Sequence, residues 1–432
     1  MAAWLLVLPI IAAPIYQWDL GGRTELRMRT FGELAADGET ERAFDWVLAG
    51  QTGFSLNYPR ATLSFGYAPS FSYTDFTGEP TRQLVHSGAI TGEWRARRLT
   101  LSIAQTGSYG EENLSPLTGG TITPPVGELP GDGEDIQAEQ NLVNQNVRYW
   151  NSTTAARVAA LLTRRHTLSF TATYGTGGGL DDESKVLYPV RYAVTGSVGL
   201  GYAVSRRDSF TTAVSGEHVI TETPRPIEED PDEEDPDEED PDVEAEPDLD
   251  DDVTTTIVRV TEAWNRQWTT DTDSTLTLGV NYVPTADPGD PLTVSVLGAA
   301  SLNHTTRPGA ASTVNYSVSI YTGTNVDRLT GRADQRVGGT GAVTWARDPV
   351  EVFANVSTVR SVDSNNPDFL TSFSANCGVR VSVVDELSLE AGSRFVNTTV
   401  EDPTTVVTTV SDAGFQWAAY VAATLAFEPI TL

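Results

Sequence analysis

The feature that most constrains this chain is a strand pattern in which apolar and hydroxylic side chains alternate. The hairpin at residues 155–173, with Thr163-Arg164-Arg165 as its tight turn, shows it most clearly. Successive side chains of a strand point to opposite faces, so its second arm has one apolar and one hydroxylic face. The apolar face carries Leu168, Phe170, Ala172 and Tyr174, and the other carries Thr167, Ser169, Thr171 and Thr173.

This unit is repeated along the chain, and the repetition predicts eighteen strands, with sixteen as the alternative count. Most of them form hairpins with short turns, while one strand precedes and one follows the series. The predicted ranges are 24–30, 45–57, 61–73, 84–95, 99–108, 155–162, 166–174, 190–204, 209–220, 256–269, 276–283, 292–303, 314–321, 335–345, 350–359, 369–384, 387–396 and 414–427.

Short turns alternate with longer polar connections, which include residues 35–41, 110–144, 175–185, 221–253 and 325–332. The alternative folds, a soluble β-sandwich or a solenoid, give no reason for such alternation. A bacterial outer-membrane barrel does, because its periplasmic turns are short and its extracellular loops are long. The sequence therefore predicts an all-β fold, a transmembrane antiparallel up-and-down β-barrel, in the bacterial outer membrane. An even number of strands places both termini on the same side of the membrane, as bacterial barrels require.

The composition favours strands over helices as membrane-spanning elements. Hydrophobic residues make up 39 % of the chain, and no run of about 18 apolar residues, as a spanning helix needs, follows the N-terminus. The apolar residues 1–13 are expected to be a signal peptide, possibly truncated because a basic segment is missing. The other interpretation is a buried first strand. Residues 14–432 are predicted to form a single barrel domain.

The net charge of −31 is unevenly distributed along the chain. Residues 228–252 hold 18 acidic residues and no basic one, and without them 41 acidic residues oppose 28 basic ones. An acidic body argues against nucleic acid as a partner. The acidic stretch lies in a predicted extracellular loop, 223–253, which should be disordered because like charges repel and proline blocks strand pairing. Weak binding of divalent cations is the alternative to a solvated acidic brush.

The sequence offers no set of residues for catalysis or for metal binding. Its four histidines have no His-x-x-x-His spacing, and the single cysteine, Cys377, excludes a disulfide scaffold. No Gly-x-Ser-x-Gly motif occurs in a strand-to-helix context. We therefore expect no enzymatic activity, no cofactor and no metal site.

Two groups of charged residues are the candidate functional positions. By strand parity, the first group faces the lumen among Ser, Thr, Gly, Ala and Asn: Arg27, Arg29, Arg157, Arg191, Arg336, Arg380, Arg394, Glu351 and Glu390. The second group falls at short turns and predicts a basic periplasmic rim: Arg97, Arg98, Arg164, Arg165, Arg206 and Arg207. These rim arginines either pair with lipid phosphates or gather an anionic solute or polymer at the periplasmic mouth.

Aromatic residues near both ends of the strands agree with the belts of a membrane barrel. Trp94, Trp268 and Trp345 stand just before short turns, while Trp46, Trp150 and Tyr73 stand near the opposite ends.

Alternating strands, short turns, long loops and an aromatic last strand resemble the outer-membrane β-barrel superfamily. The aromatic residues of that strand are Phe415, Trp417, Tyr420 and Phe427. The family usually ends on an aromatic residue that the barrel assembly machinery reads, whereas residues 428–432 follow Phe427 here. Eighteen strands without a plug are similar to porins and to the barrel partners of polysaccharide-export systems. The resemblance implies outer-membrane lipid, the assembly machinery and a periplasmic export partner as partners.

Two functions follow as expectations. The first is an outer-membrane channel that passes hydrophilic solutes or exported polysaccharide through a hydrated lumen, and the wall composition does not separate uptake from export. The second is a structural or surface-interaction barrel that its extracellular loops close.

Overall fold

The computed structural model describes residues 15–33, 40–76, 79–113, 146–181, 184–185, 188–222, 252–284, 293–309, 311–326, 333–362, 369–401 and 416–431. The described residues form eighteen strands. Their bounds are β1 (Ile15–Glu33), β2 (Thr40–Tyr58), β3 (Ala61–Phe76), β4 (Glu79–Arg95), β5 (Leu99–Asn113), β6 (Asn146–Leu161), β7 (His166–Gly179), β8 (Arg191–Ala203), β9 (Asp208–Thr221), β10 (Val253–Thr269), β11 (Thr272–Val283), β12 (Thr293–Gly309), β13 (Ser312–Val326), β14 (Ala333–Arg347), β15 (Val350–Ser361), β16 (Phe369–Val384), β17 (Leu387–Glu401) and β18 (Gln416–Thr431).

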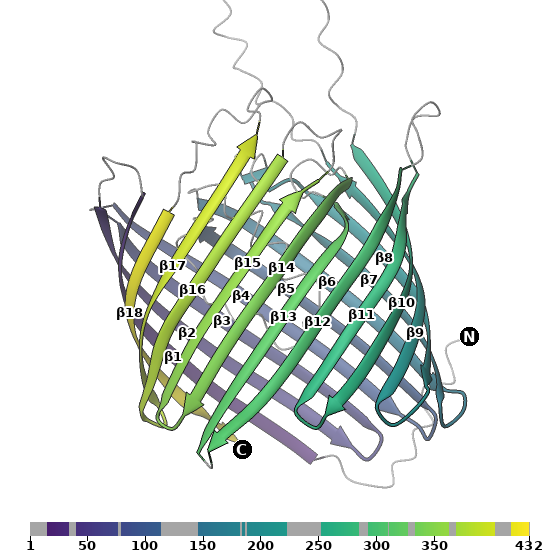
Figure 1. The fold of residues 1–432 in the computed structure, drawn as a ribbon. Helices are drawn as coiled ribbons and strands as arrows, with labels where there is room; N and C mark the ends of the chain where they lie inside the picture. The colour runs from purple at the N-terminus through teal and green to yellow at the C-terminus, as the bar shows by residue number, and fades with distance from the viewer. Residues whose placement is uncertain are drawn as a thin grey trace, which may run out of the picture.

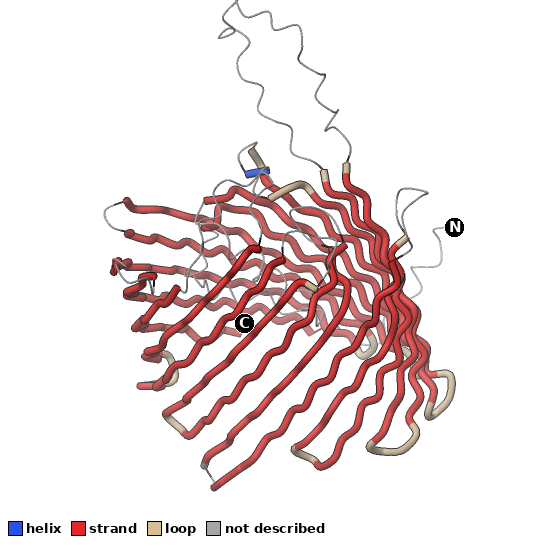
Figure 2. The backbone as a smooth tube through the Cα atoms, turned by 45° about the horizontal axis from the view of Figure 1, so that its top comes forward, coloured by secondary structure: helices blue, strands red, loops and turns tan. Residues whose placement is uncertain are grey.

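The strands close into one antiparallel barrel (Figure 1). Each strand pairs with its sequence neighbours, and β1 closes the ring by pairing with both β2 and β18. Figure 2, tilted toward one end of the barrel, shows the strands as a continuous wall. The predicted fold class and the count of eighteen are therefore confirmed. Closure leaves no free sheet edge, which is the condition for strands to cross a membrane.

Eight short turns lie at one end of the barrel, which we call the short-turn rim. β1 begins at this rim, because Ile15 pairs with Asn57 beside the β2–β3 turn. β18 also ends there, since Thr431 pairs with Asp19 of β1. The longer connections join the strands at the opposite end, which we call the loop end (Figure 1).

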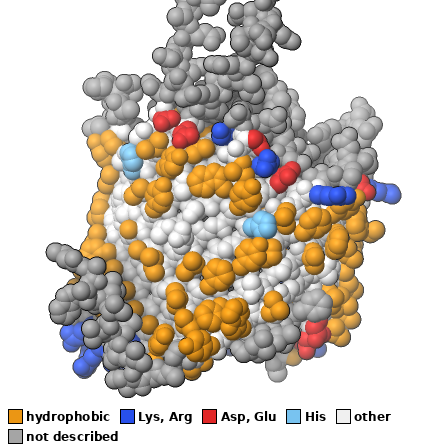
Figure 3. All heavy atoms as spheres, turned by 180° about the vertical axis from the view of Figure 1, so that it is seen from behind, with side chains coloured by type: hydrophobic (Ala, Val, Ile, Leu, Met, Phe, Trp, Pro, Cys, Tyr) orange, Lys and Arg blue, Asp and Glu red, His pale blue; other side chains and the backbone are white. Residues whose placement is uncertain are grey.

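Strand parity separates an outer from an inner face. Large apolar side chains are exposed at alternate positions, such as Val214 and Val356 at 49 % and 44 %. Figure 3 shows apolar side chains spread over the outer wall and charged ones gathered toward its edges. Residues of the other parity, such as Ser215 and Ser357, face the interior. An apolar outer band is what contact with lipid requires.

The strands extend farther than the sequence pattern predicts. β1 begins at Ile15 instead of residue 24, and β6 begins at Asn146 instead of residue 155. β7 continues to Gly179 through glycines that the sequence analysis assigned to a loop. Glycine has low strand propensity, so the local composition predicts that the strand ends before these glycines. Pairing with β6 nevertheless extends β7 through them.

Two expectations fall on residues that the structure does not describe. The proposed signal peptide, 1–13, lies wholly outside the described residues, and so does the acidic loop apart from Asp252 and Val253. Within the described ranges, no helix is long and apolar enough to cross a membrane.

Candidate functional site

The inner wall of the barrel carries the first group of candidate residues. Register places all nine at inward-facing positions, on β1, β6, β8, β14, β15, β16 and β17. For Arg29 only the backbone is described, opposite Tyr420. The structure brings several of these residues into two clusters, whereas Arg157 lies on β6 away from both.

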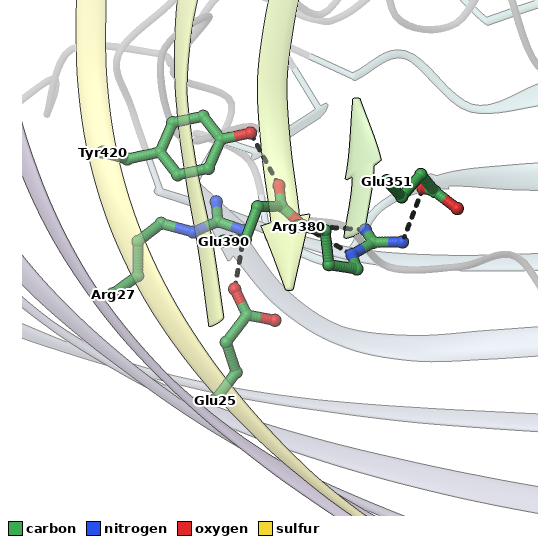
Figure 4. Close-up of polar contacts among 6 residues, drawn as sticks. All are labelled: Glu25, Arg27, Glu351, Arg380, Glu390 and Tyr420. Atoms are coloured by element: carbon green, nitrogen blue, oxygen red, sulfur yellow. Dashed lines mark hydrogen bonds and ion pairs between the residues drawn. The ribbon is translucent and has the colours of Figure 1, made fainter. Parts of the chain in front are cut away.

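The first cluster, which we call the seam cluster, comprises Glu25, Arg27, Glu351, Arg380, Glu390 and Tyr420 (Figure 4). Arg380 donates from Nε and Nη2 to Glu390 Oε2 at 2.9 and 2.7 Å. Its Nη1 also donates to Glu351 Oε1 at 3.4 Å. The Tyr420 hydroxyl donates to Glu390 Oε1 at 2.7 Å. Residues of β15, β16, β17 and β18 are thereby joined across the inner wall.

The seam cluster crosses the junction at which the barrel closes. Arg27 of β1 donates to Glu25 Oε1 at 2.6 Å, and its guanidinium carbon lies 5.2 Å from the Tyr420 ring centre. This cation–π contact joins β1 to β18. The side chains of Arg27 and Glu25 are 15 % and 8 % exposed, whereas that of Arg380 is 46 % exposed. One end of the cluster is therefore covered, and the other faces open space inside the barrel.

Inward-facing aromatic rings of this wall lie over glycines. A Cβ on Gly392 would lie 2.7 Å from the Tyr420 hydroxyl oxygen, and one on Gly378 would lie 2.7 Å from Phe353 Cζ. With a larger residue at either position the ring would have to shift, so the two glycines let the rings lie against the sheet. The rings support Arg27 and Arg380, whose guanidinium groups lie over Tyr420 and Phe353.

The second cluster lies toward the loop end, and we call it the loop-end cluster: Arg191, Glu217, Arg259, Asn281 and Arg336. Arg259 Nη1 donates to Glu217 Oε2 at 2.7 Å, and its Nη2 donates to the carbonyl oxygen of Thr324 at 3.0 Å. Arg191 Nη2 lies 3.8 Å from Glu217 Oε1.

Two members of the loop-end cluster are fully buried. Asn281 and Arg336 are 0 % and 1 % exposed although they face inward. Among the described residues, the side-chain amide of Asn281 has no hydrogen-bond partner for its oxygen or its nitrogen. This end of the inner wall is therefore covered, unlike the exposed part of the seam cluster.

Sequence reasoning missed Glu217, Arg259, Asn281 and Tyr420 as parts of these clusters. Strand parity in the predicted ranges 209–220, 256–269 and 276–283 places Glu217, Arg259 and Asn281 inward. The sequence therefore contained a signal that could have identified these three residues. Tyr420 was read as an aromatic residue of the last strand. Its hydrogen bond to Glu390 joins neighbouring strands, whereas its cation–π contact with Arg27 depends on closure of the ring.

Between the clusters, hydroxyl groups cover the inner wall. Ser319 and Thr340 lie 2.6 Å apart, as do Ser295 and Thr324, and Ser357 and Ser374 lie 2.7 Å apart. Such pairs satisfy one another. The Ser295–Thr324 pair is buried, whereas the other two are only partly buried and keep lone pairs available to water or to a solute. Among the described residues, no group of three or more His, Cys, Asp or Glu side chains is placed to hold a metal ion.

The predicted rim arginines lie in three consecutive short turns: Arg97 and Arg98 between β4 and β5, Arg164 and Arg165 between β6 and β7, and Arg206 and Arg207 between β8 and β9. All six are exposed. Their placement at one edge of the barrel follows from the register of the hairpins. What they bind stays a prediction.

The connection between β7 and β8 holds one carboxylate with a perturbed pKa outside the strands. Hydrogen bonds from Ser184 hold the pKa of Asp181 below its usual value, against the opposing effect of desolvation and with help from Arg148. The Ser184 backbone N–H donates to Asp181 Oδ1 at 2.8 Å, and Arg148 Nη1 lies 3.6 Å from Oδ2. The same connection anchors to β6, because the Arg148 N–H donates to Ser184 Oγ at 3.0 Å.

Comparison with known protein families shows which family the chain is similar to. The profile of the EpsX exopolysaccharide export family matches residues 11–225. Residues 11–225 of the chain are therefore similar to this family. The matched residues include β1–β9, which close with β10–β18 into one barrel. The family is described as one of exopolysaccharide export.

The solved structures that are similar to this barrel have low sequence identity to it. OccK7 (OpdD) of Pseudomonas aeruginosa is 8 % identical over 96 % of this chain and 99 % of its own, with a TM-score of 0.47. A mutant of the ferric enterobactin receptor PfeA of Pseudomonas aeruginosa is 9 % identical over 94 % and 80 %, with a TM-score of 0.45. The FrpB iron transporter of Neisseria meningitidis is 9 % identical over 93 % and 66 %, with a TM-score of 0.48. The search of curated proteins found no match.

Proposed function

We propose that this barrel is the conduit through which an exopolysaccharide crosses the bacterial outer membrane. The observation that carries the proposal is the match to an exopolysaccharide export family in a chain that closes into an 18-stranded barrel. Barrels of about 16–18 strands are wide enough to leave an aqueous channel. Short turns would then face the periplasm and long loops the exterior.

The inner wall suits a hydrated polymer. Its hydroxyl pairs offer many weak hydrogen bonds, and a solute moves through a channel when its sites are numerous and individually weak. The charges of the seam cluster are partly matched, since its two arginines contact its three glutamates and Arg380 contacts both Glu351 and Glu390. We assign the nine inward-facing charged positions to the wall of this conduit.

A second candidate function rests on the buried part of the loop-end cluster. Inward-facing Asn281 and Arg336 are covered, as they would be in a barrel that is closed at its outer end. Such a barrel would serve a structural or surface-interaction role without transport. The test of the first function therefore has to report on passage through the lumen.

The partners of the conduit are part of the proposal. Lipid contacts the apolar outer wall, and the barrel assembly machinery inserts it. A periplasmic export component delivers the polymer to the short-turn rim.

Thiol labelling in living cells tests the proposed function. In a Cys377→Ser background, one variant carries Ser357→Cys on the inner wall and its control carries Val356→Cys on the outer wall, one residue away on β15. A small water-soluble thiol reagent should label the inner cysteine and leave the outer one unlabelled in lipid. A bulky adduct at the inner cysteine should then lower the amount of exopolysaccharide on the cell surface.

The result that contradicts a conduit is unchanged surface exopolysaccharide in cells that lack the protein altogether. A closed barrel would be indicated if, in addition, neither cysteine reacts in intact cells while both react in the denatured protein.

A further inference from the structure

Three short turns carry the six predicted rim arginines, and two of these turns have the same local structure. Thr163 Oγ1 accepts hydrogen bonds from the N–H groups of Arg165 and His166, both at 3.1 Å. Ser205 Oγ accepts the equivalent bonds from Arg207 and Asp208, at 3.0 and 2.9 Å. The hydroxyl residue fixes the turn in both cases, so the two arginines that follow are not needed to make it. The third turn has Ala96 at the position of Thr163 and Ser205.

The three turns are neighbours around the barrel and are tied together by their backbones. The Arg98 carbonyl accepts from the N–H of Leu161 at 2.7 Å, and the Arg165 carbonyl accepts from that of Ala203 at 2.9 Å. Adjacent hairpins are two strand spacings apart, so neighbouring arginine pairs lie roughly 10 Å from one another. We call the set Arg97, Arg98, Arg164, Arg165, Arg206 and Arg207 the arginine arc.

The arginine arc forms no ion pair with the part of the protein that the structure describes. Arg207 donates to the carbonyl oxygen of Trp268 at 3.4 Å. Other arginines at this rim are paired: Arg95 with Glu93, Arg266 with Asp208, and Arg307 with Asp271. Six exposed guanidinium groups on one side of the rim are therefore available to an external anion.

The outer wall beside the arc has the features of a membrane interface. Outward-facing Tyr202, Phe210 and Trp268 are 37 %, 38 % and 44 % exposed close to these turns. Arg266, on the same outer face, lies with its guanidinium carbon 4.0 Å from the Trp268 ring centre. Aromatic rings of barrels gather at the level of lipid headgroups, and arginine is favoured there because its fork matches a phosphate.

We infer that the arginine arc binds the phosphate groups of anionic lipids in the leaflet at the short-turn rim. The alternative ligand, an anionic polymer at the mouth, is less well matched, because the inward-facing Arg95 there is already paired with Glu93. The inference rests on the proposed membrane orientation but not on export, since it concerns the outer edge of the barrel. It predicts that anionic lipid collects along β4–β9 and not evenly around the protein.

Quenching of tryptophan fluorescence by brominated lipid tests this inference. The full-length protein is placed in phosphatidylcholine vesicles with increasing brominated phosphatidylglycerol, and the quenching gives the relative affinity of the two lipids. The test variant replaces all six arginines of the arc by Gln, and a second variant replaces them by Lys. The control is Arg307→Gln with Arg347→Gln, two rim arginines outside the arc. Heat-modifiable gel mobility shows that each variant is folded.

The Gln variant should bind phosphatidylglycerol at least about tenfold more weakly than the original protein, given the attraction of each basic side chain to an anionic surface. The Lys variant should keep most of the affinity, and the control should stay within about twofold of the original protein, because Arg307 is already paired. If the Gln variant does not fold, each arginine pair is replaced separately and the losses are compared.

Equal affinity for phosphatidylglycerol in the original protein and the Gln variants would overturn the inference. A second arm adds short alginate oligomers to vesicles without anionic lipid. Loss of oligomer binding in the Gln variant, with lipid affinity unchanged, would assign the arc to an acidic polymer and would also overturn it. Failure of export in cells leaves both readouts unaffected.

Discussion

The short turns of the two halves of the barrel differ in charge, although both halves join each turn to the next strand through a backbone hydrogen bond. The turns of β4–β9 carry pairs of arginine, whereas those of β14–β17 carry exposed Asp348, Asp385 and Glu386 beside a single arginine, Arg347. In both halves, a turn carbonyl accepts a hydrogen bond from the neighbouring hairpin. Arg98 accepts from Leu161 at 2.7 Å, and Glu386 accepts from Ala426 at 2.7 Å.

This comparison teaches that the backbone bonds that join a turn to the next strand do not determine the charge at the rim. The backbone bonds that close the wall are insensitive to the side chain, so arginine and glutamate serve equally well in them. The side-chain charge of a turn residue can therefore have a role other than closing the wall. In our account, the arginine half binds anionic lipid and the acidic half repels it.

The largest expected effect comes from a charge placed on the outer wall beneath either half of the rim. Val214→Arg on β9 and Val356→Arg on β15 should each cost about 2–4 kcal/mol, because an outward arginine near mid-strand meets lipid. Ser215→Arg and Ser357→Arg, one residue away and inward, should cost far less. Urea unfolding in lipid vesicles measures all four. Equal costs within a pair would mean that the assigned register is wrong.

A smaller effect is expected when one acidic centre of the inner wall is neutralised. Glu390→Gln should cost about 1.5–3 kcal/mol, since Glu390 accepts charge-assisted bonds from Arg380 and a bond from Tyr420. Glu217→Gln tests the loop-end cluster in the same way through Arg259. Both variants should also shift the reversal potential of any channel current toward anion preference. Unchanged stability and selectivity in both would show that neither cluster supports the wall.

The third prediction concerns a variant in which arginines replace acidic residues of the acidic half, so that its charge resembles that of the arginine half. Asp385→Arg with Glu386→Arg adds a fourth arginine pair and should raise the affinity for phosphatidylglycerol by about 1 kcal/mol for each added basic residue at most. The brominated-lipid titration detects the change, and added salt should weaken it, because the charges act through a screened field. Asp385→Asn with Glu386→Gln separates loss of repulsion from gain of attraction. An affinity that does not rise in either variant contradicts the lipid account of the rim.

The smallest effect concerns the opposite end of the barrel, above the arginine half. The pKa of Asp181 is lowered in the folded chain, first by its hydrogen bonds to Ser184. A lowered pKa means that this carboxylate stabilises the β7–β8 connection above the ordinary Asp pKa of about 3.9, and that the contribution is lost as pH falls through the folded pKa. Amide exchange at residues 184 and 185 should therefore quicken as the pH falls, relative to strand amides. Asp181→Asn should remove this pH dependence, and its persistence in that variant would assign it to another group.

Much of the fold could be predicted from the sequence, because a lipid-facing strand carries apolar side chains at alternate positions. This alternation shows which residues face outward. Phe170 and Tyr174 show this on β7, where both are exposed on the outer face. The ends of the strands could not be predicted in the same way. β1 reaches back to Ile15 because it pairs with β2 up to Asn57, and that partnership is not visible in the local pattern.

The sequence predicted which charged residues face the lumen, but it did not predict which of them contact one another. Parity placed Arg27, Arg380 and Glu390 on the inner face. The contact of Arg27 with Tyr420 depends on closure of β1 against β18, which joins residues about 400 positions apart in the chain. Ion pairs between strands distant in sequence leave no local signal, and the burial of Asn281 depends on what covers the wall.

The most direct test of the central claim is a planar-bilayer recording of the purified barrel with fragments of exopolysaccharide from the same cells. The account predicts a steady ionic conductance, as for a hydrated lumen, with brief blockades when fragments are added at the short-turn side. The blockade frequency should rise with the fragment concentration. A barrel that is folded and inserted but carries no current, or carries a current that the fragments never interrupt, would contradict a conduit for exopolysaccharide.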